Sequence, residues 1–105
     1  MTRTYDKLVR DRIPDIIEDD GEVPVVRTAT TDAEYERYLL AKLEEEVAEY
    51  REDREPEELA DVLEVVHAIR EYEGLEASEL AELREEKAER RGGFADRIVL
   101  ERVET

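Results

Sequence analysis

Residues 42–65, KLEEEVAEYREDREPEELADVLEV, decide the fold because two helical patterns meet there at one short break. Apolar residues recur at helical spacing on both sides of this break. They are Tyr35, Leu39, Leu43, Val47 and Tyr50 before it, and Leu59, Val62, Leu63, Val66 and Ile69 after it. Pro56 suits the first turn of a new helix, so the segment REDREP predicts a tight turn. The stretch therefore predicts an antiparallel helical hairpin.

Helix-end signals extend this prediction in both directions. Thr31 and Glu34 form a capping-box pattern that begins the first hairpin helix. Gly74 suits the C-terminal end of the second hairpin helix. Upstream, a short helix is expected within residues 5–20, with Pro14 tolerated in a first turn.

The rest of the chain predicts one more long helix and a pair of strands. The helix ELAELREEKAERR (79–91) is expected to follow a Ser78 cap and to stop at Gly92–Gly93. The segments PVVRTAT (24–30) and DRIVLERVE (96–104) favour strands, and each is the obvious partner of the other.

The expected fold class is all-α, with a small two-stranded β appendage, in one domain over residues 1–105. One hairpin and a third helix give too little core to bury such wide apolar arcs. We therefore expect a homodimer, or a higher homo-oligomer, in which the hairpins of two copies pair into a four-helix bundle.

The charge composition excludes several classes of partner. Of the 105 residues, 46% are charged, and the formal net charge is −16. So acidic a surface repels nucleic acid and anionic membranes, and neither is expected as a partner. The absence of cysteine excludes disulfides and thiolate chemistry. No apolar stretch approaches about 18 residues and no signal-peptide pattern opens the chain, which favours a soluble, cytoplasmic protein.

The balance between the two long cationic residues favours a halophilic source. The chain has 13 arginines but only three lysines, beside 32 acidic residues. At very high salt the Debye length shrinks to about 3 Å, which mutes the self-repulsion of such a surface. A salt-rich cytoplasm is therefore our hypothesis for its origin.

Four carboxylates of the hairpin are the candidate metal ligands: Glu46, Glu49, Glu58 and Asp61. Acidic pairs at this spacing are common in so acidic a chain, so their position on the helices must discriminate. On a helical wheel Glu46 falls inside the apolar stripe, Glu49 lies on its edge, and Glu58 falls inside the apolar arc of the second helix. In an antiparallel hairpin Glu46 stands level with Asp61, and Glu49 with Glu58.

Carboxylates that interrupt apolar faces need compensation, because burying a lone charge costs several kcal/mol. A divalent cation between the two helices supplies it. All-oxygen ligands suit Mg²⁺, with Mn²⁺ as a possible substitute, better than zinc. A chance arrangement of solvated acids is the alternative, and we weigh the metal cage above it.

Two runs carry a resemblance to a known family: KLEEEVAEY (42–50) and EELADVLEV (57–65). They resemble the all-α nucleotide pyrophosphohydrolases of the MazG superfamily, whose Glu-x-x-Glu and Glu-x-x-Asp motifs match the four carboxylates. The opening YDKLVRDRIPDII (5–17) and the late KAERRGGF (87–94) are similar to a house-cleaning subfamily, often labelled as like phosphoribosyl-ATP pyrophosphohydrolase. The connection departs from the superfamily pattern, because only eight residues separate the two motifs.

The resemblance implies hydrolysis of a nucleoside triphosphate between the α and β phosphates, giving a nucleoside monophosphate and pyrophosphate. Glu45 matches an extra glutamate that often precedes the first motif. A carboxylate not fully committed to the metal, with Glu45 and Glu49 as the candidates, is expected to take the proton from the attacking water. The substrate class implied is a nucleotide, with its base undetermined.

Cationic residues are the candidates for binding the substrate phosphates: Lys7, Arg10, Lys42, Lys87, Arg90, Arg91 and Arg97. An ion pair between Lys42 and Glu46, one helical turn apart, is an equally good interpretation of that lysine. The cations at the end of the third helix also suit the helix dipole without any ligand. The tyrosines, Tyr38 among them, are assigned to the core rather than to base stacking.

Two other functions remain open from the sequence. One is the phosphoribosyl-ATP step of histidine biosynthesis, because metal and phosphate motifs do not identify a base. The other, from a different class, is a non-catalytic acidic helical module that binds a partner.

Overall fold

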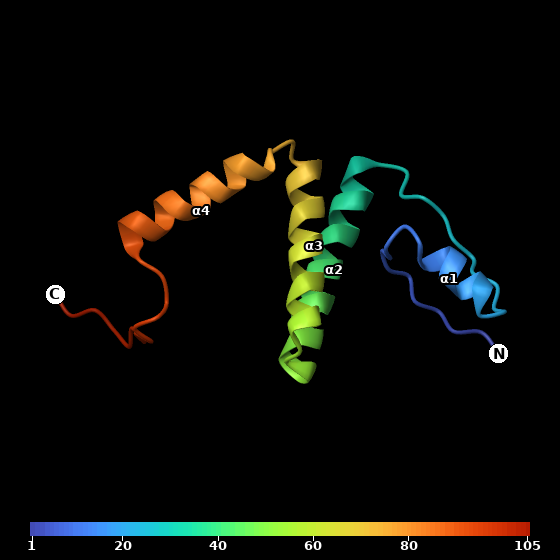
Figure 1. The fold of residues 1–105 in the computed structure, drawn as a ribbon, viewed down its shortest axis with the longest axis horizontal. Helices are drawn as coiled ribbons and strands as arrows, with labels where there is room; N and C mark the ends of the chain where they lie inside the picture. Colours follow the sequence, from blue (N-terminus) through green and yellow to red (C-terminus); the bar gives the residue numbers. More distant parts are fainter. The chain divides into compact units, whose positions relative to one another are not determined.

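The computed structural model describes residues 1–105 and contains four helices and no strand. They are α1 (Ile13–Asp19), α2 (Asp32–Asp53), α3 (Pro56–Tyr72) and α4 (Ala77–Arg91), in the order of Figure 1. The chain divides into two compact units, Met1–Ile69 and Arg70–Thr105. The all-α fold class predicted from the sequence is thus confirmed.

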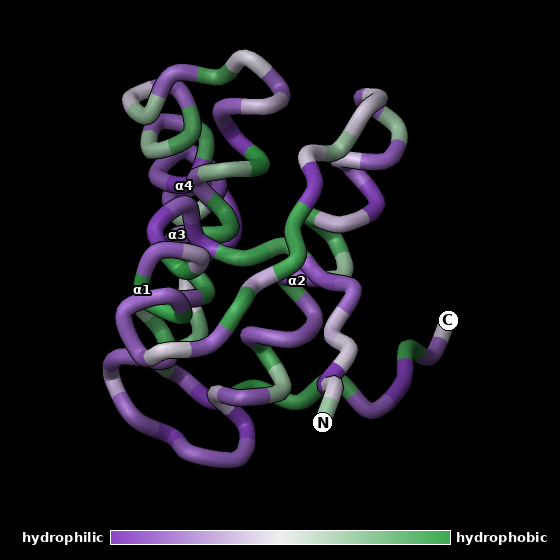
Figure 2. The backbone as a smooth tube through the Cα atoms, turned by 90° about the vertical axis from the view of Figure 1, so that its right-hand side faces the viewer, coloured by the Kyte–Doolittle hydropathy of each residue, from purple (hydrophilic) through white to green (hydrophobic).

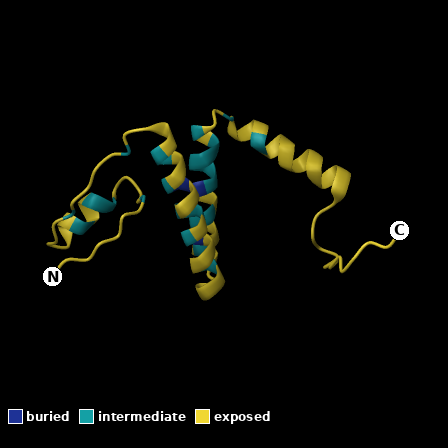
Figure 3. Cartoon of the chain, turned by 180° about the vertical axis from the view of Figure 1, so that it is seen from behind, coloured by how far each residue is buried: buried dark blue, intermediate teal, exposed yellow.

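Helices α2 and α3 form the predicted hairpin and lie side by side in Figures 1 and 3. The Thr31 hydroxyl accepts a hydrogen bond from the amide of Glu34 at 3.1 Å, as a capping box requires. The Glu34 carboxylate reaches back one residue further than predicted, to the amide of Thr30 at 3.2 Å. Pro56 is the first residue of α3, as expected.

The turn between the two helices consists of Arg54 and Glu55 alone. Arg54 closes α2 in the left-handed conformation, with φ 58°, and its amide donates to the carbonyl of Tyr50 at 2.9 Å. This ending without glycine costs some conformational strain, which the short connection imposes.

The core between the hairpin helices is small. Leu39 and Val65 are its buried hydrophobic side chains, and Glu46 is the buried charged one. Figure 3 shows these buried positions on α2 and α3. Other apolar residues of the same stripes, such as Val47 and Leu63, stay 43% and 54% exposed. The hairpin therefore positions the carboxylates, but it leaves much of its apolar surface uncovered.

The short helix predicted within residues 5–20 is present as α1, which begins at Ile13. Pro14 lies in its first turn, as predicted, and costs no helical hydrogen bond there. Upstream, Asp6 adopts a positive φ of 45°, which breaks any helical path through residue 6. The segment before Ile13 therefore has no regular secondary structure.

The start of α4 differs from the predicted Ser78 cap. Glu76, not Ser78, is the N-cap residue, and it exchanges backbone-to-side-chain bonds with Glu79 as a capping box. The amide of Glu76 donates to the Glu79 carboxylate at 3.1 Å. The glutamate pair three residues apart outcompetes the serine because it satisfies two free amides at once. Gly92 follows the last helical residue with φ 79°, as the sequence indicated.

The predicted two-stranded appendage is wrong for this structure. Residues 24–30 and 96–104 form no strand, although their composition favours one. A strand needs ladder bonds to a neighbour, and two of these amides are used in local bonds instead. The amide of Thr30 bonds to Glu34, and that of Arg97 donates to the carbonyl of Phe94 at 3.1 Å in a turn.

No helix is both long enough and apolar enough to cross a membrane. Figure 2 shows hydrophilic and hydrophobic residues mixed along the chain.

Candidate metal centre

Three carboxylates converge between α2 and α3. Glu46 of α2 and Glu58 and Asp61 of α3 offer oxygen atoms that all lie within 4.8 Å of one another. Glu58 and Asp61 share one face of α3 because they are three residues apart. Glu46 faces them across the hairpin. The structure thus brings together three of the four predicted metal ligands.

Burial makes this cluster different from the many acidic pairs on the surface. Glu46 is only 6% exposed. One oxygen of Glu46 and one of Glu58, the Oε2 atom in each, are buried and accept no hydrogen bond from the protein. An unsatisfied buried carboxylate oxygen carries a large desolvation cost. Two such atoms beside a third carboxylate fit a hard divalent cation, which binds oxygen ligands.

Glu49 lies outside the group of three. Its side chain is exposed, as its place on the edge of the apolar stripe indicated, and Glu46 rather than Glu49 groups with Glu58. Partial removal from water, followed by the charge and hydrogen bond of Glu46, raises the pKa of Glu49 above the ordinary glutamate value. Glu49 therefore belongs to the electrostatic surroundings of the cluster.

Lys42 pairs with two carboxylates at the N-terminal side of the cluster. Its Nζ atom lies 3.0 Å from Glu46 Oε1 and 3.2 Å from Glu45 Oε2. Partial burial by itself would lower the pKa of Lys42, but the hydrogen bonds to Glu46 and Glu45 outweigh it and raise that pKa. The ion pair expected from the sequence is thus present, and the lysine stays charged beside the candidate metal ligands.

The N-terminal segment delivers two further cations to the same carboxylates. Lys7 Nζ lies 2.6 Å from Glu45 Oε1, and Arg10 Nη2 lies 2.8 Å from Asp61 Oδ1. Burial alone would raise the pKa of Glu45, but the hydrogen bonds from Lys7 and Lys42 lower it below the ordinary value. Arg10 therefore lies at the cluster and Lys7 bonds to the neighbouring Glu45, although both cations are far from these residues in sequence.

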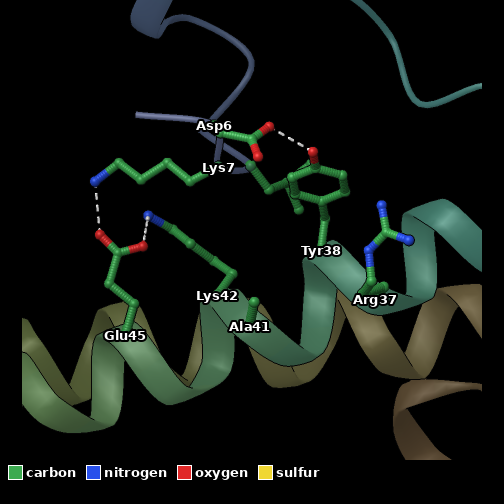
Figure 4. A pocket seen from close by; sticks show the side chains of 8 residues that line it. Asp6, Lys7, Arg37, Tyr38, Ala41, Lys42 and Glu45 are labelled. Atoms are coloured by element: carbon green, nitrogen blue, oxygen red, sulfur yellow. Dashed lines mark hydrogen bonds and ion pairs between the residues drawn. The ribbon is translucent and has the colours of Figure 1, made fainter. Parts of the chain in front are cut away.

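A pocket of about 270 Å³ adjoins the cluster along α2. Figure 4 shows its lining residues Asp6, Lys7, Leu8, Arg37, Tyr38, Ala41, Lys42 and Glu45. The Tyr38 hydroxyl donates to Asp6 Oδ1 at 2.5 Å, which ties the N-terminal segment to α2. Tyr38 was predicted to lie in the core, and Arg37 was not among the predicted site residues. The spacing of Tyr38, one turn before Lys42, was the available signal.

The remaining predicted phosphate-binding residues belong to the second unit. Lys87, Arg90 and Arg91 lie on α4, with both arginines in its last turn. Arg97 follows in a turn, with a positive φ of 59°. All four side chains are exposed, and the arginines in the last turn also suit the dipole of α4.

In the absence of divalent cations, Glu58→Gln is expected to raise the thermal midpoint by a few degrees at pH 7. Burial, followed by the charges of Asp53, Asp61 and Glu46, raises the pKa of Glu58. The raised pKa means that ionised Glu58 destabilises the folded chain. This destabilisation is absent below the ordinary glutamate pKa, where Glu58 is protonated in the folded and the unfolded chain. It grows between the ordinary pKa and the raised pKa, and it is complete above the raised pKa. Scanning calorimetry from pH 4 to pH 8 should show the gain only in the upper part of this range.

Glu64→Gln is the matched control, because Glu64 is an exposed glutamate of the same helix. Saturating Mg²⁺ should remove the advantage of the Glu58 variant by stabilising the unchanged chain. If Glu58→Gln were less stable than the parent chain at pH 7 without metal, repulsion between Glu58 and its neighbouring carboxylates would be contradicted.

Comparisons with known proteins leave the family open. No protein-family model and no solved structure matches the chain. A stretch of 45 residues is 58% identical to an uncharacterized protein of Mycolicibacterium smegmatis (strain ATCC 700084 / mc(2)155), covering 43% of this chain and 45% of that protein. The chain therefore spans less than half the length of this curated relative. Since the relative is itself uncharacterized, the functional argument depends on the chemistry of the site.

Proposed function

We propose that the chain is a Mg²⁺-dependent nucleotide pyrophosphohydrolase. It would cleave a nucleoside triphosphate between the α and β phosphates, with non-canonical nucleotides as the target of a house-cleaning role. The observation that carries the proposal is the pair of buried, unpartnered oxygens of Glu46 and Glu58 beside Asp61. The resemblance to the MazG superfamily connects such a cage with nucleotide hydrolysis.

Glu46, Glu58 and Asp61 are the residues that would hold the metal, with Mn²⁺ as a possible substitute for Mg²⁺. When bound, the ion would polarise phosphate oxygens and make a bound water more acidic. Glu49 is the fourth predicted ligand and lies outside this group of three. Glu46 is the buried member of the group, and Glu58 and Asp61 are half-buried.

Glu49 suits the general base better than Glu45 does. Lys7 and Lys42 both bond to Glu45 and lower its pKa, so this carboxylate holds a proton weakly. The pKa of Glu49 is raised, which brings it closer to the working pH of a proton acceptor. Glu49 is also exposed, so it can be reached by water. Its proposed role is to take the proton of the water that attacks phosphorus.

The cations beside the cage would bind the substrate phosphates. Arg10 contacts Asp61, and Lys42 contacts Glu46, so each stands next to a proposed metal ligand. Both side chains neutralise acidic groups that would otherwise repel a triphosphate. Lys87, Arg90, Arg91 and Arg97 of the second unit stay candidate phosphate-binding residues, as predicted from the sequence.

A homodimer is part of the proposal. Leu40, Val47, Leu59 and Leu63 of the hairpin stay between 43% and 54% exposed, which is unusual for residues on an amphipathic stripe. A second hairpin would cover them as a four-helix bundle. Sedimentation equilibrium at molar KCl is expected to give a dimer or a higher multiple. A monomer at working concentration would contradict this.

Pyrophosphate release from a panel of nucleotides, with Mg²⁺ at molar KCl, tests the proposed activity. The panel should contain standard and non-canonical nucleoside triphosphates and phosphoribosyl-ATP. Turnover confined to phosphoribosyl-ATP would move the assignment to histidine biosynthesis. Absence of turnover with every nucleotide would defeat the enzymatic proposal and favour a non-catalytic helical module.

A further inference from the structure

We propose that the pocket of Lys7, Arg37, Tyr38 and Lys42 binds the pyrophosphate end of the substrate, which leaves as inorganic pyrophosphate. This inference rests on the proposed function and adds to it a subsite of stated chemistry. The subsite would take a diphosphate anion. Three features of the pocket support this choice: its position, its charge, and a tyrosine ring that two arginines already contact.

Lys42 connects the pocket to the carboxylate cluster. It lines the pocket, and its Nζ atom lies 3.0 Å from Glu46 Oε1 of the cluster. Lys42 and Tyr38 precede Glu46 by one and two helical turns, which places them about 6 Å and about 12 Å away along the axis of α2. A polyphosphate held at the cluster by one end can therefore extend directly into the pocket.

The pocket is cationic in a chain whose net charge is −16. Its lining contains three cations, Lys7, Arg37 and Lys42, against two carboxylates, Asp6 and Glu45. Both carboxylates are already engaged, since Asp6 accepts from Tyr38 and Glu45 accepts from the two lysines. Lys42 is also paired with Glu46, just outside the lining, so Lys7 and Arg37 are the cations that an anion would meet, and most of the remaining surface repels one.

The cations can accept a phosphate without giving up their present partners. An ammonium group has three donors, and Lys7 uses one of them on Glu45 in Figure 4. No dashed line reaches Arg37 in that view, whereas both lysines are tied to Glu45. Arginine binds phosphate through two parallel donors, so this side chain is the strongest candidate ligand of the pocket.

The aromatic residue of the pocket does not favour a nucleobase. The guanidinium groups of Arg27 and Arg37 already lie against the Tyr38 ring, 5.8 Å and 5.4 Å from its centre. Its hydroxyl is bonded to Asp6. Stacking a base on this ring would displace these contacts. The only apolar lining besides the ring comes from Leu8 and Ala41, which is too little for a nucleoside site.

Calorimetric titration of the full chain with inorganic pyrophosphate and, separately, with AMP tests the inference. Both titrations are made with Mg²⁺ present at one fixed KCl concentration. Arg37→Gln and Lys7→Gln are each expected to weaken pyrophosphate binding by about tenfold or more, because each removes a charged hydrogen bond. The same variants should leave AMP affinity unchanged. Arg37→Lys should recover part of the lost affinity.

Arg51→Gln is the matched control, because Arg51 is an exposed arginine in the last turn of α2. Its pyrophosphate affinity should equal that of the parent. Loss of AMP affinity with pyrophosphate binding unchanged would overturn the inference and place the nucleoside in the pocket. Unchanged binding of both probes in Arg37→Gln and Lys7→Gln would also overturn it.

The readout separates this inference from the proposed activity, because binding is measured without turnover. If the parent chain hydrolyses no nucleotide but Arg37→Gln binds pyrophosphate more weakly than the parent does, the proposed activity is disproved and the subsite is supported. If the parent chain hydrolyses nucleotides and every variant binds pyrophosphate as tightly as the parent does, the proposed activity is supported and the subsite is disproved.

Discussion

Glu46→Gln is expected to lower the rate of nucleotide hydrolysis by at least about 10³-fold, since a catalytic metal contributes several kcal/mol to the transition state. Glu46 is the buried member of the carboxylate cluster, and its Oε2 atom accepts no hydrogen bond from the protein. A glutamine keeps the shape of the side chain but removes the negative charge that a divalent cation needs. The measurement is pyrophosphate release with Mg²⁺ under saturating nucleotide.

Glu44→Gln is the control for this variant, because Glu44 is an exposed glutamate two residues away on the same helix. It should retain the full rate. Titration with Mn²⁺, followed by electron paramagnetic resonance, should show weak metal binding in the Glu46 variant and unchanged binding in the control. Persistent activity of Glu46→Gln, or of the companion Asp61→Asn, would disprove the cage even if the chain were a pyrophosphohydrolase.

The thermal midpoint is expected to rise by roughly 10 °C or more between 0.1 M and 2 M KCl, a shift that a small domain shows for a change of one to three kcal/mol. The reason is the net charge of −16 carried by 32 acidic residues. The Debye length falls from about 10 Å at 0.1 M to about 3 Å at 1 M, so the repulsion is largely screened within this range. Exposed ion pairs, such as Arg102 with Glu104, are weak and lose little.

A variant with fewer charges on α4 separates screening from general salt effects. Glu82, Glu86 and Glu89 are exposed, and their joint replacement by glutamine should raise the midpoint at low salt and shrink the gain from KCl. Scanning calorimetry of both chains across the KCl series gives the comparison. A midpoint that does not respond to KCl would end the halophilic hypothesis.

The hairpin and its buried acid were predictable because both depend on short-range periodicity. The stripes around Leu39 and Leu59 define two helices, and Pro56 defines their junction. The position of Glu46 inside such a stripe also marked it as the residue that burial would set apart. Glu49, predicted as the fourth ligand, lies on the edge of that stripe and outside the group of three.

The pocket could not be predicted, because it depends on the path of an irregular segment. Lys7 meets Glu45 across 38 residues, and Arg10 meets Asp61 across 51. These contacts require the positive φ of Asp6 and its hydrogen bond to Tyr38, neither of which leaves a periodic pattern. The two strand predictions were wrong for a related reason, since strand composition does not reveal whether a ladder partner is present.

The two-residue turn at Arg54 and Glu55 affects how the carboxylate cluster would exchange a divalent cation. So short a connection prevents α2 from sliding along α3, so Glu46 and Glu58 are held near each other whether or not a cation lies between them. Folding, rather than metal binding, bears the electrostatic cost of bringing the acids together. A cation that binds there would meet preorganised carboxylates and would lose little free energy to ordering the protein. Fast exchange with the metal pool of the cell, without partial unfolding, is the behaviour that such a cage permits.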